Sequence, residues 1–317
     1  MSAAAGQARG HESTETWPLI DRVSLWLSWA AGLLLCALAG AIVIYMLVKG
    51  LQFLRPELLF SHPQPELDQS KSGGFLDPLI GTFLLTVIGT GLALVPGVAI
   101  AVWLSEYARP FWLARAVESG VEVVAGTPSI VLAIFGLILF SQQLFAPLSF
   151  TAEGGAVFGR SFLAAGAMMA LIALPLIVGG TREALQAIPR HVREASYALG
   201  KTKIATIRRV LLPTARPGIA TGTALGMGRV AGDTAIVVIL LGASLQLSAA
   251  GGGPVLSTLR GTGSTLTSYV YNNSPAGEGN APEKAYAAAF VLLLIVIALN
   301  FAIDVLSRRR QAPAWNT

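Results

Sequence analysis

The sequence has little of what soluble enzymes and metalloproteins depend on. Only 12% of its 317 residues are charged, and it contains one cysteine and three histidines. A lone cysteine, Cys36, excludes a disulfide framework within the chain. The histidines, His11, His62 and His191, are too scattered to form a metal-spaced cluster. A nucleophile constellation is also missing, so we expect no catalytic residues, no metal and no cofactor bound by this chain.

Apolar residues are what the sequence has in abundance. They make up 54% of the chain, and the mean hydropathy is +0.65, which is typical of helical membrane proteins. Six apolar runs are long enough to cross a bilayer: 25–48, 79–104, 123–140, 162–178, 219–242 and 285–303. We therefore predict an all-α polytopic membrane protein with six transmembrane helices.

These runs divide the chain into segments. We expect a polar N-terminal tail at 1–24, a first transmembrane helix at 25–48, an extracytoplasmic loop at 49–76, a transmembrane core at 77–308 and a C-terminal tail at 309–317. The first run is too long for the apolar part of a signal peptide, so it is interpreted as a retained anchor. The charged stretch 105–122 is expected to link the second and third spans.

The stretch Thr181–Pro217, between the fourth and fifth runs, holds eight basic residues against two acidic ones. Its pattern predicts two short helices and a turn. Pro189 suits the first turn of a helix, and Gly200 can end that helix in the left-handed conformation. Thr202 can cap the second helix, which Pro213 is expected to end. The predicted apolar faces are Val192, Ala195 and Leu199 on the first helix, and Ile204, Ile207 and Leu211 on the second.

Three interpretations compete for this stretch. Residues 195–202 fit a relaxed phosphate-binding loop, but the residues before Gly200 favour helix rather than a glycine-rich turn. A DNA-binding helix-turn-helix fits the charge, but membrane spans on both sides would hinder its entry into a major groove. The third interpretation is a cytoplasmic docking element.

The orientation follows from the distribution of Lys and Arg between the loops. Placing the 181–217 stretch inside the cell gives fifteen basic residues on the cytoplasmic side and six outside. The asymmetry predicts that both termini are cytoplasmic.

The fifth apolar run contains glycines and two ionisable residues. The glycines recur at four-residue spacing in two rows: Gly218, Gly222 and Gly226, then Gly228 and Gly232. Small residues at this spacing let another helix approach closely. Arg229 and Asp233 are four residues apart, where one helical face would bring them together. Ionisable residues inside a membrane mark either a substrate path or a structural ion pair, and both interpretations stay open.

The 181–217 stretch resembles the signature loop of inner-membrane permeases of ATP-binding-cassette (ABC) importers, E-A-A-x3-G-x9-I-x-L-P. The chain has Glu194-Ala195-Ser196, then Gly200, then Val210-Leu211-Leu212-Pro213 at the matching spacing. In that family the loop docks on an ATPase subunit and carries its motion into the membrane. The resemblance implies a coupling role for Arg193, Glu194, Ala195, Gly200, Leu212 and Pro213.

Two further segments resemble permeases of phosphate importers, and the stretch from Lys284 to Asn300 resembles the last helix of their PstA-type subunit. Residues 228–234 read G-R-V-A-G-D-T where those permeases have G-R-x-x-G-E-T, and residues 126–131 resemble their G-x-P-S-I-V segment. The substrate-path residues implied by the resemblance are Arg229, Asp233, Thr234, Thr127 and Ser129. Asp233 replaces a glutamate of the family, and Gly179 stands where the family usually has an arginine.

The resemblance implies an importer permease that moves inorganic phosphate across the inner (cytoplasmic) membrane. Its partners would be a second homologous permease subunit, two ATPase subunits that bind ATP and Mg, an extracytoplasmic phosphate-binding protein and the lipid bilayer, with no nucleic acid. One alternative is an importer of another oxyanion, such as sulfate, molybdate or phosphonate. The other is a membrane-anchored nucleic-acid-binding regulator that uses helices within residues 190–212.

Overall fold

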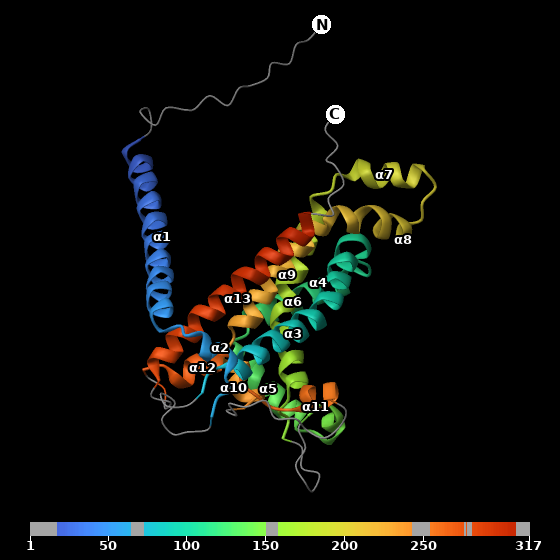
Figure 1. The fold of residues 1–317 in the computed structure, drawn as a ribbon. Coiled ribbons are helices and arrows are strands. Elements are labelled where there is room, and N and C mark those ends of the chain that lie inside the picture. Colours follow the sequence, from blue (N-terminus) through green and yellow to red (C-terminus); the bar gives the residue numbers. More distant parts are fainter. Residues whose placement is uncertain are drawn as a thin grey trace. The chain divides into compact units, whose positions relative to one another are not determined.

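The computed structural model describes residues 18–64, 73–149, 158–242, 254–275, 277 and 281–308. Every regular element in these ranges is a helix (Figure 1), which confirms the all-α fold class. The chain divides into two units, residues 1–48 and 49–317. Residues 1–17 of the predicted N-terminal tail and the whole C-terminal tail, 309–317, lie outside the described residues.

Helix α1, Leu19–Phe53, contains the first predicted span and supplies nearly all of the described part of the first unit. It has 35 residues, more than the roughly 20 that a bilayer crossing needs. Its apolar side chains are exposed along the helix, as at Trp26 and Leu34. A helix that is apolar on all sides and exposed is suited to an environment of lipid.

The second unit is built around four long helices: α3 (Leu76–Val102), α6 (Phe162–Gln186), α9 (Leu212–Gly232) and α13 (Pro282–Arg308). Helix α6 packs against both α3 and α9, and α13 packs on α9. The main hydrophobic core lies along α6 and includes Leu85, Met169, Ala173 and Ile177.

Helices α6 and α9 approach closely because glycines face each other. A Cβ atom added at Gly180 would come within 2.8 Å of the Cα atom of Gly222. Gly218 and Gly226 also face α6, so the predicted packing role of this first glycine row is confirmed. Glycines 228 and 232 have open space where a side chain would stand, so the second row does not pack against the described part of this chain.

The structure corrects the predicted linker at 105–122 and the predicted third span at 123–140. Helix α3 continues as the π-helical turn η2 (Trp103–Tyr107), and α4 (Phe111–Gly126) occupies most of the linker. Helix α5 (Ser129–Phe140) then leaves α4 at 106°. Thr127, the C-cap of α4, has an extended backbone, as expected for a residue before proline. Hydropathy detects apolar length but not this bend.

The predicted fifth span at 219–242 is also interrupted. Helix α9 ends at Gly232, and a separate short helix, α10 (Ala235–Leu240), follows. Helices α5 and α10 pack against each other in the main core. Within the described ranges four helices are long and apolar enough to cross a membrane, or five if α4 and α5 form one bent span. The predicted count of six is therefore not confirmed.

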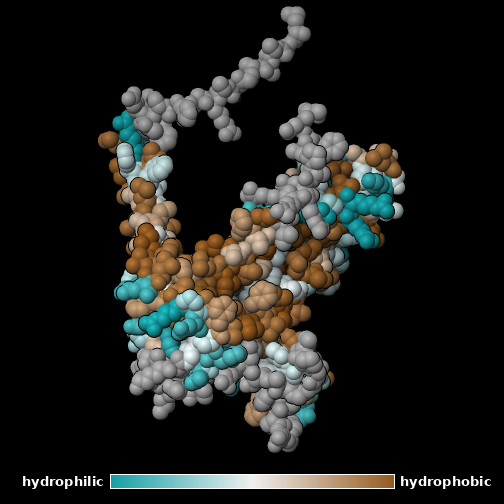
Figure 2. Space-filling model, viewed as in Figure 1, coloured by the Kyte–Doolittle hydropathy of each residue, from teal (hydrophilic) through white to brown (hydrophobic). Residues whose placement is uncertain are grey.

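The remaining helices of the second unit lie toward its two ends (Figure 1). One end carries α7 (Arg190–Ala198), α8 (Lys203–Thr206) and the π-helical turn η4 (Ile207–Leu211). The other carries α2 (Pro56–Phe60), α11 (Pro254–Arg260) and α12 (Leu266–Asn273), and the 3₁₀ turn η3 spans Gln143–Leu148. Hydrophobic residues cover much of the surface between the two ends in Figure 2, and hydrophilic ones gather at the ends. This distribution matches a helix bundle that crosses a membrane.

Candidate coupling and translocation sites

Helices α7 and α8 form a tight pair, which we call the coupling hairpin (residues 190–206). Gly200 in its turn has a φ of 74°, and the Thr202 hydroxyl accepts a hydrogen bond from the Ala205 N–H at 3.3 Å. Both the predicted glycine stop and the predicted threonine cap are confirmed. The buried hydroxyls of Ser196 and Thr206 are 2.8 Å apart and join the two helices. The hairpin is therefore held together by polar contacts at its turn and between its helices.

The second helix of the hairpin does not end at Pro213, contrary to the prediction. The helical backbone runs from Lys203 through η4 into α9. The π-helical hydrogen bonds of η4 end one residue before Pro213, where the Leu212 N–H bonds to the carbonyl of Ile207. This wider turn accommodates a proline ring and its missing N–H. Leu212 and Pro213 consequently lie half-buried in the first turn of α9.

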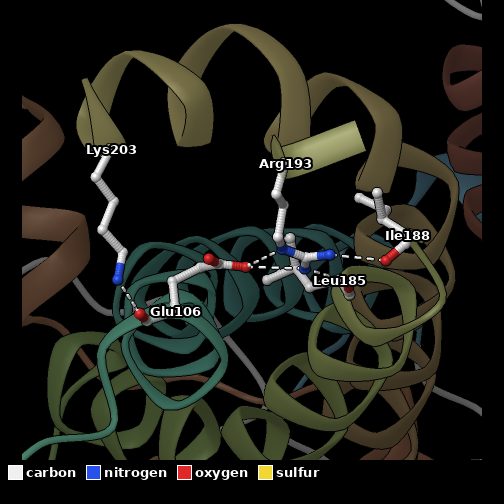
Figure 3. A network of polar contacts seen from close by, with 5 residues as sticks. All are labelled: Glu106, Leu185, Ile188, Arg193 and Lys203. Atoms are coloured by element: carbon white, nitrogen blue, oxygen red, sulfur yellow. Dashed lines mark hydrogen bonds and ion pairs between the residues drawn. The ribbon is translucent and has the colours of Figure 1, made fainter. Parts of the chain in front are cut away.

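Arg193 on α7 holds the hairpin against the ends of two membrane helices (Figure 3). Its Nε and Nη2 atoms donate to Oε1 of Glu106 in η2, at 3.0 and 2.9 Å. Its Nη1 and Nη2 atoms also donate to the carbonyls of Ile188 and Leu185, at 2.7 and 2.9 Å. The Glu106 side chain is only 6% exposed, and that of Arg193 is 19% exposed. A shielded, charge-assisted contact of this kind fixes geometry more firmly than a surface ion pair.

Lys203 on α8 meets the same residue from the other side (Figure 3). Its ammonium donates to the backbone carbonyl of Glu106 and lies 4.4 Å from the centre of the Tyr107 ring. The last carbonyls of a helix have no partner within that helix, and a lysine there also complements the helix dipole. The hairpin therefore reaches the end of α3 through one cation from each of its helices.

Other side chains of the hairpin point outward. Glu194 and Ala195 are exposed. The large apolar residues Tyr197, Leu199 and Ile204 are 42%, 78% and 71% exposed. The two predicted apolar faces thus divide: Ile207 and Leu211 are buried while Leu199 and Ile204 are not. The hairpin presents an uncovered apolar tip beside an acidic residue.

The structure separates Arg229 from Asp233, which were predicted to share a helical face. Arg229 is exposed on α9, in a stripe with Thr221, Leu225 and Gly232. No ion pair joins it to Asp233. The reason is that α9 ends at Gly232 and the backbone of Asp233 is extended. The structural ion pair that the sequence left open is not formed.

The Asp233 carboxylate instead caps α10. It is 7% exposed, and its Oδ1 atom accepts a hydrogen bond from the Ile236 N–H at 2.9 Å. The Asp233 carbonyl accepts another from the Thr267 hydroxyl on α12, at 3.2 Å. Thr234, the next residue, is half-buried at the same break. Asp233 therefore stabilises the interruption between α9 and α10.

Thr127 and Ser129 lie at the other interruption, between α4 and α5. The Thr127 hydroxyl donates to the Val123 carbonyl at 2.7 Å, and both residues are half-buried. No hydrogen bond recorded for the described residues links them to Arg229 or to the Asp233 break. The structure thus distributes the five predicted path residues over two helix breaks and one exposed stripe.

Arg182, close to the position where the resembling family has its arginine, forms an ion pair with Glu118 of α4. Gly179 itself has open space around it. The contact ties α6 to α4 and leaves no basic side chain at Gly179.

Comparison with known proteins places these sites in a family. Residues 97–312 match the binding-protein-dependent transport system inner membrane component family. The chain belongs to this family. As a permease it is a multi-pass inner-membrane protein of an ABC importer and a translocation component rather than an enzyme.

Individual relatives agree with this assignment. The chain is 32% identical over 251 residues to the phosphate transport system permease protein PstA 1 of Mycobacterium tuberculosis, covering 78% of this chain and 75% of that protein. It is 31% identical over 248 residues to the phosphate transport system permease protein PstC of Xylella fastidiosa, covering 74% and 72%. Identity at this level does not separate the two subunit types.

A solved structure shows the same fold. A chain of a bacterial alginate ABC transporter, in complex with a periplasmic protein bound to an alginate pentasaccharide, superposes with a TM-score of 0.59. It is 14% identical and the superposition covers 92% of the permease and 96% of that chain.

Sequence reasoning missed two residues of the permease that the structure places at the hairpin. Glu106 was interpreted only as part of a charged linker, and Lys203 only as one of many basic residues. The sequence did offer a signal for Glu106, because this residue comes just after a long apolar run that is predicted to end on the same side of the membrane as the basic hairpin. The pairing itself joins residues 87 and 97 positions apart and leaves no local pattern.

Proposed function

We propose that this chain is the permease subunit that carries inorganic phosphate inward in an ATP-driven importer. The observation that carries the proposal is the family match together with relatives named as phosphate transport permeases over about three quarters of the chain. The chain supplies a path through the membrane, and two ATPase subunits that bind ATP and Mg supply the energy.

The coupling hairpin would be the docking site for one ATPase subunit. Its exposed apolar side chains, Tyr197, Leu199 and Ile204, form a compact tip suited to burial in a groove of a partner protein. Glu194 and Ala195 are exposed on the same hairpin. Arg193 faces inward and would hold the hairpin against the membrane helices, while Gly200, Leu212 and Pro213 shape the turn and the helix that leads back into the membrane.

Arg229 would be the residue that meets phosphate. Its guanidinium is exposed on α9 and has no partner within the described ranges of the chain, and a guanidinium can bind two phosphate oxygens at once. A second homologous permease subunit would cover this stripe of α9 and the neighbouring Gly228, and would enclose the path. Asp233, Thr234, Thr127 and Ser129 would shape the path at the two helix breaks.

The basic hairpin would face the cytoplasm, by the positive-inside rule. Helix α13 ends toward the hairpin end of the second unit (Figure 1), which supports a cytoplasmic C-terminus. An extracytoplasmic phosphate-binding protein would dock at the opposite end, and we assign the N-terminus to the cytoplasm from the charge count alone.

Competition experiments test the substrate. The permease is reconstituted in liposomes with its partner subunits and binding protein, and uptake of labelled phosphate is measured with excess unlabelled sulfate, molybdate or phosphonate. We expect unlabelled phosphate alone to compete. Strong competition by another of these anions, with weak competition by phosphate, would reassign the substrate.

A further inference from the structure

Glu106, which lies outside the coupling hairpin, is hydrogen-bonded to both helices of the hairpin. Glu106 accepts two hydrogen bonds from Arg193 of α7 through its carboxylate and one from Lys203 of α8 through its backbone carbonyl. Figure 3 shows the two cations reaching Glu106 from opposite sides. Among the described residues, every hydrogen bond between the hairpin and the α3–η2 helix runs through Glu106.

The chain path explains why this contact matters. The hairpin is covalently continuous with α6 on one side and with η4 and α9 on the other. Helix α3 has no such continuity, because residues 108–189 separate Tyr107 from the hairpin. Its attachment to the hairpin consists of the Glu106 contacts, the Lys203 ammonium over the Tyr107 ring, and packing of Val102 on an apolar cluster that Val192 of the hairpin also joins.

The Arg193 guanidinium also binds the carbonyl of Leu185, in the last turn of α6, and that of Ile188, just past the end of α6. One planar group therefore joins α7, the end of α6 and the end of α3 at a single point. Because the Glu106 carboxylate is shielded from water, its attraction to Arg193 is weakly screened. A joint of this kind is suited to making three elements move together.

We propose that Glu106 is a positioning residue that ties α3 to the coupling hairpin, so that displacement of the hairpin by the ATPase moves α3 together with α6 and α9. The inference rests on the proposed function and extends it to a residue far from the hairpin in sequence. Without the carboxylate, the ATPase would still move the hairpin, but α3 would follow only through the Lys203 contacts and apolar packing, and part of the ATP would be spent without transport.

The test compares Glu106→Gln with the wild-type permease in the complete reconstituted complex. Glutamine keeps the shape and a hydrogen-bond acceptor but removes the charge that Arg193 faces. We expect the complex to assemble and the number of anions taken up per ATP hydrolysed to fall about tenfold, within the range that single residues change coupling. The matched control is Glu118→Gln, which removes the ion pair between α4 and Arg182 and should leave this ratio unchanged.

A second variant tests the proposal if the complex with Glu106→Gln assembles poorly. In a Cys36→Ser background, Glu106→Cys with Arg193→Cys allows a reducible bifunctional thiol reagent to replace the ion pair by a covalent link. The linked complex should recover most of the uptake per ATP, and reduction should abolish the recovery. An unchanged ratio in Glu106→Gln, equal ratios before and after reduction, or failure of both variants to assemble would each overturn the proposal.

The ratio can be measured with any anion that the wild-type complex transports. A wild-type complex that carries a different oxyanion would refute the phosphate assignment while leaving the Glu106 test intact. A wild-type complex that hydrolyses ATP without moving any of these anions would refute the proposed function itself.

Discussion

At the scale of single residues, Arg229 and Asp233 have different environments and so different expected effects. Arg229 is exposed and makes no ion pair with any residue that the structure describes, whereas Asp233 is buried and caps α10. A side chain without partners contributes little to folding, so its removal reports on function. A capping carboxylate contributes to stability directly.

We expect Arg229→Gln to abolish phosphate uptake while the complex assembles at normal yield, because glutamine cannot offer the anion a bidentate cationic fork. Uptake and co-purification of the partner subunits are measured in parallel. Arg115→Gln, which removes an exposed arginine of α4 that stacks on Phe111, is the control and should transport normally. Normal uptake by Arg229→Gln would remove this residue from the path.

Replacing Asp233 tests the cap. Asp233→Ala leaves the Ile236 N–H without its acceptor and should lower stability by about 1 kcal/mol, the usual cost of losing a helix N-cap. Asp233→Asn retains an oxygen at the same position and should lose only a few tenths of that amount. Thermal unfolding of the purified complex in detergent compares the two. Equal melting temperatures for alanine and asparagine would contradict the capping role.

At the scale of elements, the coupling hairpin depends on its left-handed turn. Gly200→Val should strain that turn by about 1–2 kcal/mol, because a side chain is disfavoured at positive φ and a β-branched one most of all. We expect weak co-purification of the ATPase subunits and loss of uptake, with binding-protein affinity unchanged. Gly200→Asn is the matched control, since asparagine tolerates this conformation, and it should retain most of the uptake.

The hairpin also shows what could be predicted from sequence. Gly200 and Thr202 act on backbone within three residues of themselves, so local pattern was enough to predict the turn and the cap. The break at Asp233 was missed because valine, alanine and leucine continue on both sides of it and hydropathy does not change. Pro213 was misjudged because the π-helical turn that accommodates it depends on neighbouring residues rather than on proline alone.

The contact between Glu106 and the hairpin could not be predicted from local sequence. It depends on α3 and α6 packing side by side, which brings together residues 87 positions apart. The same holds for the candidate path residues. Motif matches selected them from the sequence, but only the packed bundle shows that Arg229 is exposed and that Asp233 caps α10 instead of facing Arg229.

At the scale of the whole molecule, the orientation in the membrane can be tested by labelling. In a Cys36→Ser background, Arg160→Cys should react with an impermeant maleimide added to intact cells, and Lys201→Cys should react only after the membrane is broken. Any outer membrane is permeabilised first. Arg160 is exposed and Lys201 half-exposed, so both thiols are expected to be reachable from their own side. The reverse pattern would invert the proposed topology.

The proposed function is tested most directly by measuring accumulation of labelled phosphate in liposomes that contain the complete complex and enclose ATP. We predict that phosphate accumulates inside above its external concentration and that this accumulation requires both internal ATP and the external binding protein. A complex lacking this permease should give none. Accumulation that persists without ATP, or active ATP hydrolysis without phosphate uptake, would contradict the assignment of this chain to an ATP-driven phosphate importer.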